Sequence, residues 1–232
     1  MITKGARGVV LIHGLGRSPL SMRPIERRLA AHGYAVLNLG YPSRSADIPS
    51  LAAGIARDIA GWRPGDTMDF VTHSLGGVLI RHAVASGALS VERIHRVVML
   101  GPPNSGSELA DRLPRWPVVG PLYRRLTGPA GAQLGTDDQS APAQLPAVTF
   151  DVGVIAGTRS YNPIFSALLG ASNDGKVRVD RTPVTGMRDF LEVPYWHPFL
   201  MTPTPVHDAI LAFLETGRFR HSTLIIATTK DL

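Results

Sequence analysis

Residues 68–77 read Met68-Asp69-Phe70-Val71-Thr72-His73-Ser74-Leu75-Gly76-Gly77, and this stretch decides the fold. The run 68–72 is mostly apolar and β-prone, which is typical of a strand buried on both faces. Apolar residues at helical spacing follow from about 76 to 86, so a strand passes directly into a helix at Ser74. A serine on such a sharp turn projects its hydroxyl above the carboxyl end of the strand, where only small neighbours fit. The stretch therefore predicts a strand–turn–helix unit with Ser74 as a candidate nucleophile.

The rest of the chain repeats this alternation of strand and helix. Further β-rich runs lie at 8–12, 35–39 and 96–100, and strands are expected again at 148–156 and 190–193. Helical spacing begins after Ser18 or Ser21, which are candidate N-caps, and recurs at 48–62 and at about 204–215. This order predicts an α/β fold whose sheet has about six mostly parallel strands, right-handed crossovers and helices on both faces.

Residues 104–146 interrupt the alternation. Prolines are frequent there, and they surround an apolar cluster that includes Trp116, Leu122 and Leu126. Such a composition favours a small cap insertion with short helices over another crossover. Because single α/β domains commonly reach 200–250 residues, the 232 residues predict one domain that contains this cap.

Composition excludes several classes of protein. With 44% hydrophobic and 18% charged residues, the chain can bury a core and is unlike a disordered protein. No run of 18 apolar residues occurs, and the apolar run before His13 is too short for a signal peptide, so we expect a cytoplasmic protein without a membrane span. The absence of cysteine excludes disulfides, thiolate metal sites and cysteine-based catalysis.

The formal net charge of +6 raises the question of an anionic partner. The basic residues are scattered singly or in pairs without interleaved aromatics, which favours a solvated surface over a nucleic-acid interface. Four arginines nevertheless lie beside the apolar residues of the cap, and they leave open a weak association with anionic lipid surfaces: Arg112, Arg115, Arg124 and Arg125.

Two motifs resemble those of a known family. Thr72-His73-Ser74-Leu75-Gly76 is similar to the Gly-x-Ser-x-Gly nucleophile elbow of α/β-hydrolase lipases and esterases, with Thr72 in place of the first glycine. His13-Gly14-Leu15-Gly16 follows the first strand as the His-Gly loop of these lipases does. The resemblance implies that the backbone N–H groups of Leu15 and Leu75 form an oxyanion hole. A dinucleotide loop is disfavoured, since Pro19 stands where its last glycine belongs.

A serine nucleophile needs a base and an acid that orients this base, and in this family they follow in the order Ser, acid, His. The acid candidates are Asp174 and Asp180, whereas Asp151 would lie early in its strand, at the wrong end of the sheet. Asp174 is preferred because Asp174-Gly175-Lys176-Val177 resembles the acid loop of the family. The same Asn-Asp-Gly sequence is also strong turn chemistry without any catalytic role.

His197 and His207 are the candidates for the base. His197 lies just past the final predicted strand, where the family places its histidine, and His207 falls inside the last helix beside its apolar stripe. His197 is therefore preferred. The other histidines have no metal-ligand spacing, so we expect neither a metal nor a cofactor.

The resemblance extends from Val9 to about Phe219, and with no strand before Gly8 it suggests the minimal, small-lipase type of the fold. It implies a serine hydrolase that cleaves small-molecule or lipid carboxylic esters of short to medium acyl length through an acyl-enzyme intermediate. A thioesterase, an amidase or an acyltransferase would use the same residues. The alternative from another class is a non-catalytic, hydrolase-like module that binds an apolar ligand under the cap.

Overall fold

A computed structural model of the chain describes residues 7–62 and 65–221. These residues form one parallel sheet in the order β2-β1-β3-β4-β5-β6. Its strands are β1 (Gly8–Ile12), β2 (Ala35–Leu39), β3 (Met68–His73), β4 (Ile94–Leu100), β5 (Asp151–Gly157) and β6 (Asp189–Val193). The predicted α/β fold with about six strands is confirmed, and every pair of neighbouring strands is parallel.

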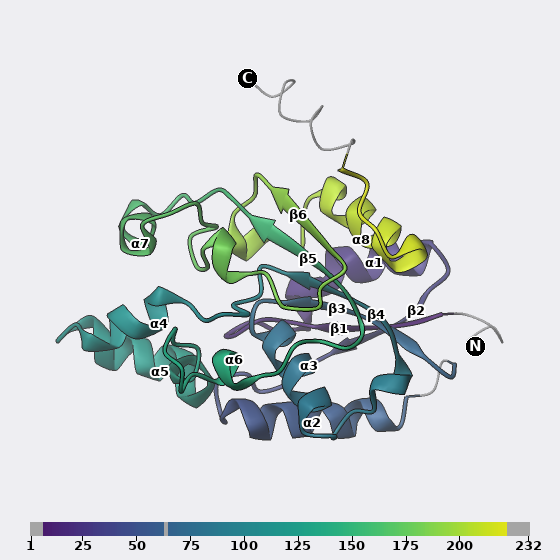
Figure 1. Cartoon of the computed structure of the whole chain (residues 1–232), viewed down its shortest axis with the longest axis horizontal. Helices are drawn as coiled ribbons and strands as arrows, with labels where there is room; N and C mark the ends of the chain where they lie inside the picture. Colours follow the sequence, from purple (N-terminus) through teal and green to yellow (C-terminus); the bar gives the residue numbers. More distant parts are fainter. Residues whose placement is uncertain (1–6, 63–64, 222–232) are drawn as a thin grey trace.

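Helices cover both faces of the sheet (Figure 1). Alternate residues of each strand point to opposite faces, so Val10 and Ile12 join one apolar cluster while Val9 and Leu11 join the other. The first cluster includes residues of α2 (Ile48–Ala60) and α3 (Leu75–Ala85), and the second includes residues of α1 (Arg23–Ala31) and α8 (Thr204–Thr216). Within 7–62 and 65–221, no helix is both long enough and apolar enough to span a membrane.

Local chemistry sets the ends of these helices. The side chain of Asp47 accepts a hydrogen bond from the Ser50 N–H and caps α2, and Gly217, at a φ of 75°, ends α8. The prediction for α1 is wrong in one detail. Ser18 precedes a short 3-10 helix, η1 (Pro19–Met22), without a capping hydrogen bond from its side chain, and Met22 then occupies the N-cap position of α1.

Residues 104–146, between β4 and β5, form the short helices α4 (Glu108–Arg112), η3 (Leu113–Arg115), α5 (Val119–Ala132) and α6 (Ala141–Gln144). Gly128 breaks α5 with a φ of 63°, and a Cβ there would lie 1.9 Å from the carbonyl oxygen of Arg44. The remaining elements are α7 (Pro163–Leu169), η2 (Val91–Arg93), η4 (Val179–Arg181) and η5 (His197–Phe199). Helices α4, α5 and α7 extend beyond one end of the sheet (Figure 1).

A buried arginine ties this insertion to the sheet. Arg81 projects from α3, and its Nη1 donates to the carbonyl oxygen of Asn104 at 3.0 Å. Its Nη2 donates to the carbonyl oxygens of Leu145 and Pro146 at 3.2 and 3.3 Å. Both ends of the insertion are thus held by one side chain.

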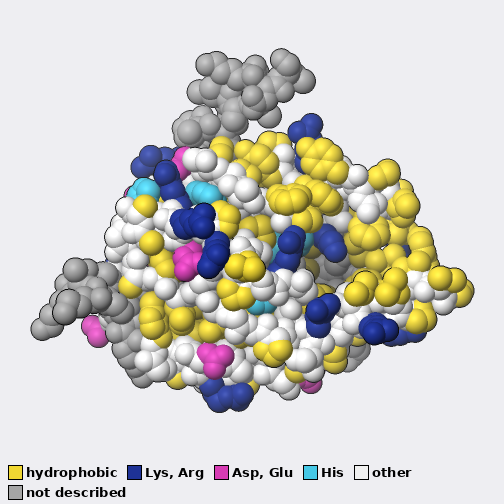
Figure 2. All heavy atoms as spheres, turned by 180° about the vertical axis from the view of Figure 1, so that it is seen from behind, with side chains coloured by type: hydrophobic (Ala, Val, Ile, Leu, Met, Phe, Trp, Pro, Cys, Tyr) yellow, Lys and Arg dark blue, Asp and Glu magenta, His cyan; other side chains and the backbone are white. Residues whose placement is uncertain are grey.

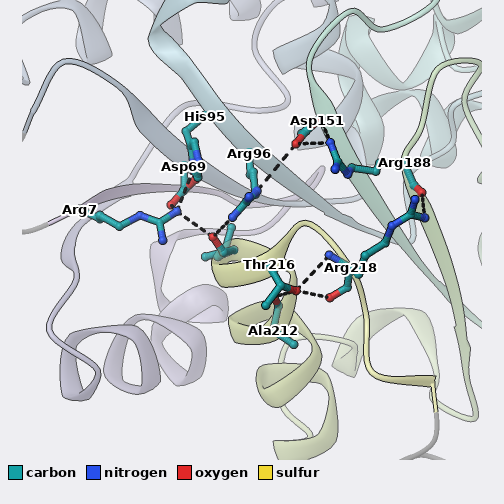
Figure 3. A network of polar contacts seen from close by, with 10 residues as sticks. Arg7, Asp69, His95, Arg96, Asp151, Arg188, Ala212, Thr216 and Arg218 are labelled. Atoms are coloured by element: carbon teal, nitrogen blue, oxygen red, sulfur yellow. Dashed lines mark hydrogen bonds and ion pairs between the residues drawn. The ribbon is translucent and has the colours of Figure 1, made fainter.

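The opposite end of the sheet carries an ion network (Figure 3). Buried Asp69 accepts from Arg7 at 2.9 Å and contacts His95 at 2.8 Å. Arg7 and Arg96 both donate to the carbonyl oxygen of Leu214, near the end of α8. These contacts neutralise the carbonyl end of α8 and join that helix to the amino ends of the strands.

Candidate active site

The candidate site lies where the order of the strands along the sheet reverses. Strand β1 lies between β2 and β3. The connection after β1 leads to β2, toward one lateral end of the sheet, and the connection after β3 leads to β4, toward the other. The carboxyl ends of strands at such a switch point are the common ligand site of open α/β sheets. A cavity of about 540 Å³ opens there, and Leu15, Ser74 and His197 line it together with residues of α4, α5 and α7.

Ser74 occupies a strained turn between β3 and α3. Its φ of 52° and ψ of −121° make it the sole non-glycine residue with a positive φ in the part of the chain that the structure describes. Its N–H donates to the carbonyl oxygen of Leu100 at 2.9 Å. A Cβ on Gly76 would lie 2.7 Å from the carbonyl oxygen of Ile12, so this turn requires glycine there. A conformation of this kind costs about 1–3 kcal/mol and persists only because the surroundings hold it.

Thr72 replaces the first glycine of the family motif, and the helix that follows accommodates it. Its side chain is fully buried, and Oγ1 lies 3.4 Å from the position that a Cβ of Gly77 would occupy. A side chain is tolerated on the strand because the facing helical residue has none. Oγ1 has no hydrogen-bond partner among the described residues.

Asp174 and His197 form a buried pair. His197 Nδ1 donates to Asp174 Oδ2 at 2.6 Å, and the His197 N–H donates to the Asp174 carbonyl oxygen at 2.9 Å. The other carboxylate oxygen, Oδ1, accepts from the N–H groups of Lys176 at 3.0 Å and Val177 at 2.8 Å. The loop thereby fixes the carboxylate and leaves one oxygen for the imidazole, whose Nε2 is then free to accept a proton.

The His-Gly loop passes directly beside Ser74. A Cβ on Gly14 would lie 3.0 Å from the Cβ of Ser74. The N–H of Gly16 donates to the hydroxyl oxygen of Ser43 at 2.9 Å. Leu15 lies between them, and Leu75 is the first residue of α3. Within the described ranges, neither the Leu15 N–H nor the Leu75 N–H donates to a protein acceptor. Both backbone donors are therefore unused by the protein, which is a condition for the oxyanion hole predicted at these two residues.

Comparison with known proteins identifies the family. The family model described as "Alpha/beta hydrolase family" matches residues 9–231. The chain belongs to the α/β hydrolase family. A search of curated protein sequences finds no match to this α/β hydrolase.

Several solved structures share the fold of this hydrolase. The mature lipase BlEst2 of Bacillus licheniformis is 20% identical, with a TM-score of 0.69 and 94% of each chain covered. Lipase B of Aspergillus fumigatus is 14% identical, with a TM-score of 0.72, and the match covers 98% of this chain and 57% of that one. A metagenomic carboxyl esterase is 22% identical, with a TM-score of 0.64, and 84% of this chain and 65% of that one are covered. At these identities the likeness concerns the fold.

The three residues of this hydrolase that the sequence disfavours as acid or base lie away from the candidate site. Asp180 is exposed and pairs with Arg178, and Asp151 opens β5 at the opposite end of the sheet. His207 contacts the carbonyl oxygen of Met201 at 2.9 Å from within α8. The structure thus brings Asp174 and His197 together, and His197 lines the same cavity as Ser74. No direct hydrogen bond joins Ser74 to His197 among the described residues. Such bonds are frequently long before substrate binds.

Two further positions of this α/β hydrolase, which contact the candidate site, escape sequence reasoning. Gly101 follows β4 with a φ of 53°, and a Cβ there would lie 3.0 Å from both Asp174 Oδ2 and His197 Nδ1. His73 contacts the His197 carbonyl oxygen through Nε2 at 3.0 Å. Burial, reinforced by nearby His197, lowers the pKa of His73 well below 6.5, so a neutral ring donates to that carbonyl. A glycine at a strand end was the only signal for Gly101, and the motif position was the only signal for His73.

Proposed function

We propose that this α/β hydrolase cleaves carboxylic esters through an acyl-enzyme intermediate. Ser74 attacks the acyl carbon while Nε2 of His197 takes its proton, and Asp174 keeps the other imidazole proton on Nδ1. The N–H groups of Leu15 and Leu75 hold the oxyanion. His197 returns its proton to the leaving alcohol and then activates the water that releases the acid.

One observation carries this proposal. The 2.6 Å contact between His197 and Asp174 orients the imidazole at a cavity that is also lined by the strained Ser74. A binding module would have no need for a buried acid–base pair or for a serine with a positive φ. The names of the structural neighbours, lipases and a carboxyl esterase, agree with ester hydrolysis.

The cavity supports an acyl chain of short to medium length. Its volume of about 540 Å³ lies in the range of small-ligand pockets, and its wall is largely aliphatic. The aliphatic wall residues of the insertion include Leu109, Leu113, Val119, Leu122 and Leu126. Leu122 and Leu126 are also more than half exposed to solvent, so the groove is open at its insertion side.

A fluorophosphonate probe tests the proposal, because it labels a serine only where a base and an oxyanion hole activate it. We expect labelling of the folded protein at Ser74, and no labelling of Ser74→Ala. Esters of 4-nitrophenol from acetate to palmitate should be hydrolysed, with the highest kcat/KM at short to medium chains. Folded protein that is neither labelled nor active would favour the binding module. A rate that rises sharply only above substrate solubility would favour a lipid-surface enzyme instead.

A further inference from the structure

Two positive charges lie in the catalytic cavity. Arg17 and Lys176 both line it, and none of the described residues that line it is Asp or Glu. Arg17 directly follows the Gly14-Leu15-Gly16 loop, and Lys176 lies two residues after Asp174. Both cations therefore belong to the loops that carry the proposed catalytic groups. Basic side chains near the middle of one face lie beside the hydrophobic side chains over α4, α5 and α7 (Figure 2).

Local contacts position both residues at the cavity. Arg17 Nη2 donates to the carbonyl oxygen of Pro198 at 2.9 Å, one residue beyond His197. The Lys176 N–H donates to Asp174 Oδ1, its carbonyl oxygen accepts from Ser107 Oγ at 2.7 Å, and its Nζ lies 5.9 Å from the centre of the Phe165 ring. The Arg17 guanidinium is thereby positioned beside His197, and the backbone of Lys176 is fixed beside Asp174, while both basic side chains remain exposed to solvent at the wall of the cavity.

Neither charge has an acidic partner of its own among the described residues. No salt bridge joins Arg17 or Lys176 to a carboxylate in the described part of the chain, whereas Arg178 and Arg181 both pair with Glu108. Burial lowers the pKa of Lys176, the nearby charge of Arg17 lowers it further, and Asp174 offsets this only in part. Asp174 is already engaged with His197. A cavity with two unpaired cations favours an anion.

We infer that the substrate is an ester with an anionic group, a carboxylate or a phosphate, which binds to Arg17 and Lys176 while the acyl chain lies on the aliphatic wall. This inference rests on the proposed function and specifies its substrate class. A charge-assisted hydrogen bond to a guanidinium or an ammonium is stronger than a neutral one, so the anion orients the ester relative to Ser74. The cap arginines do not serve this role, because none of the four lines the cavity: Arg112, Arg115, Arg124 and Arg125.

Matched ester pairs test the inference. The first pair is 4-nitrophenyl valerate and mono-4-nitrophenyl glutarate, which differ by a carboxylate on the acyl side. The second is a monoacylglycerol and the same molecule with a phosphate on the glycerol, both below their aggregation limits. We expect a higher kcat/KM for the anionic member of at least one pair, and the pair that responds identifies the anion and its side of the ester.

Variants of Arg17 and Lys176 test whether these two side chains bind the anion. Arg17→Gln and Lys176→Gln should each lower the ratio of anionic to neutral kcat/KM by about tenfold. Arg125→Gln is the matched control, because Arg125 is exposed on α5 and does not line the cavity. It should leave the ratio unchanged. Equal kcat/KM values within both pairs, or variants that slow both members equally, would overturn the inference while leaving ester hydrolysis intact.

A binding measurement keeps the inference testable apart from turnover. Calorimetry with Ser74→Ala should show that hexyl phosphate or hexanoate binds more tightly than hexanol, and that adding Arg17→Gln weakens the anion about tenfold. If no ester is hydrolysed but this difference is found, the proposed function fails and the anion site stands. If hexanol binds as tightly as both anions, the anion site fails.

Discussion

Replacing Asp174 by asparagine tests the orientation of the base. The side-chain amide can take the place of the carboxylate in two ways. With its NH₂ group toward His197, it donates to Nδ1 and moves the imidazole proton to Nε2, which then has no lone pair for the Ser74 proton. With its oxygen toward His197, its NH₂ group faces the N–H groups of Lys176 and Val177, and both lose their acceptor.

The structure indicates which orientation prevails. A buried donor without an acceptor costs about 1–3 kcal/mol, so the two lost bonds disfavour the productive orientation by about 2–6 kcal/mol. Since each 1.4 kcal/mol is about a factor of ten, the productive tautomer falls to a fraction between about 4 × 10⁻² and about 5 × 10⁻⁵. The lost carboxylate charge also leaves the transient imidazolium unsupported. We therefore expect Asp174→Asn to lower kcat/KM by about 10³–10⁴.

The assay is kcat/KM with a soluble 4-nitrophenyl ester, with circular dichroism to verify the fold. Asp180→Asn is the control, because Asp180 is exposed and its loss should change the rate by about twofold or less. A mild Asp174→Asn together with a crippled Asp180→Asn would refute the assignment of the acid. His197→Ala and His207→Ala separate the two candidate bases in the same way.

Three further predictions concern stability, measured as the free energy of unfolding in urea. Burial lowers the pKa of His13 and His73 below 6.5, so the unfolded chain binds more protons than the folded one, and the free energy of unfolding decreases as the pH drops below about 6.5, by at most about 1.4 kcal/mol per pH unit for each ring. His73→Gln should reduce this slope, and a free energy of unfolding that does not change with pH would contradict the prediction. Arg81→Met leaves buried carbonyl oxygens without donors and should cost about 2–4 kcal/mol, and a loss below about 0.5 kcal/mol would contradict the tie to the insertion. Gly54 lies inside α2 with room for a Cβ, so Gly54→Ala should stabilise the protein by about 0.5–1 kcal/mol. Gly76→Ala forces a Cβ against a carbonyl oxygen and should destabilise it, and equal effects of the two substitutions would refute this contrast.

The strands and long helices were predictable because their burial leaves a mark in the sequence. A strand covered on both faces, such as β1, is nearly all apolar, and a helix covered on one face repeats its apolar residues at spacings of three and four. Helix α7 was missed because it has only seven residues and a single fully buried one, Leu169. Its signal was the pairing of Asn162-Pro163 at the start with Gly170 at the end.

The candidate site was predictable to the extent that motif order reflects fold order. Ser74, Asp174 and His197 each follow a strand of the same sheet, and parallel strands bring their carboxyl ends to one edge. Contacts between the loops were not predictable. Gly101 must lack a side chain because Asp174 and His197, which come from distant loops, lie beside it. Arg17 and Lys176 are likewise far apart in the sequence but line the same cavity. Sequence spacing carries no record of such distances.

The same geometry separates stability from chemistry. Parallel strands collect all their amino ends at one edge, where Asp69, Arg96 and Asp151 join α8 to the sheet through charges (Figure 3). Their carboxyl ends collect at the other edge, where Ser74 is held in a conformation that costs about 1–3 kcal/mol. Strand β3 carries both features, with Asp69 near its start and Ser74 directly after its end. The ion network can therefore stabilise the strand that bears the strain without placing another charge beside the serine, whereas the arginine and lysine side chains that line the cavity are those of Arg17 and Lys176.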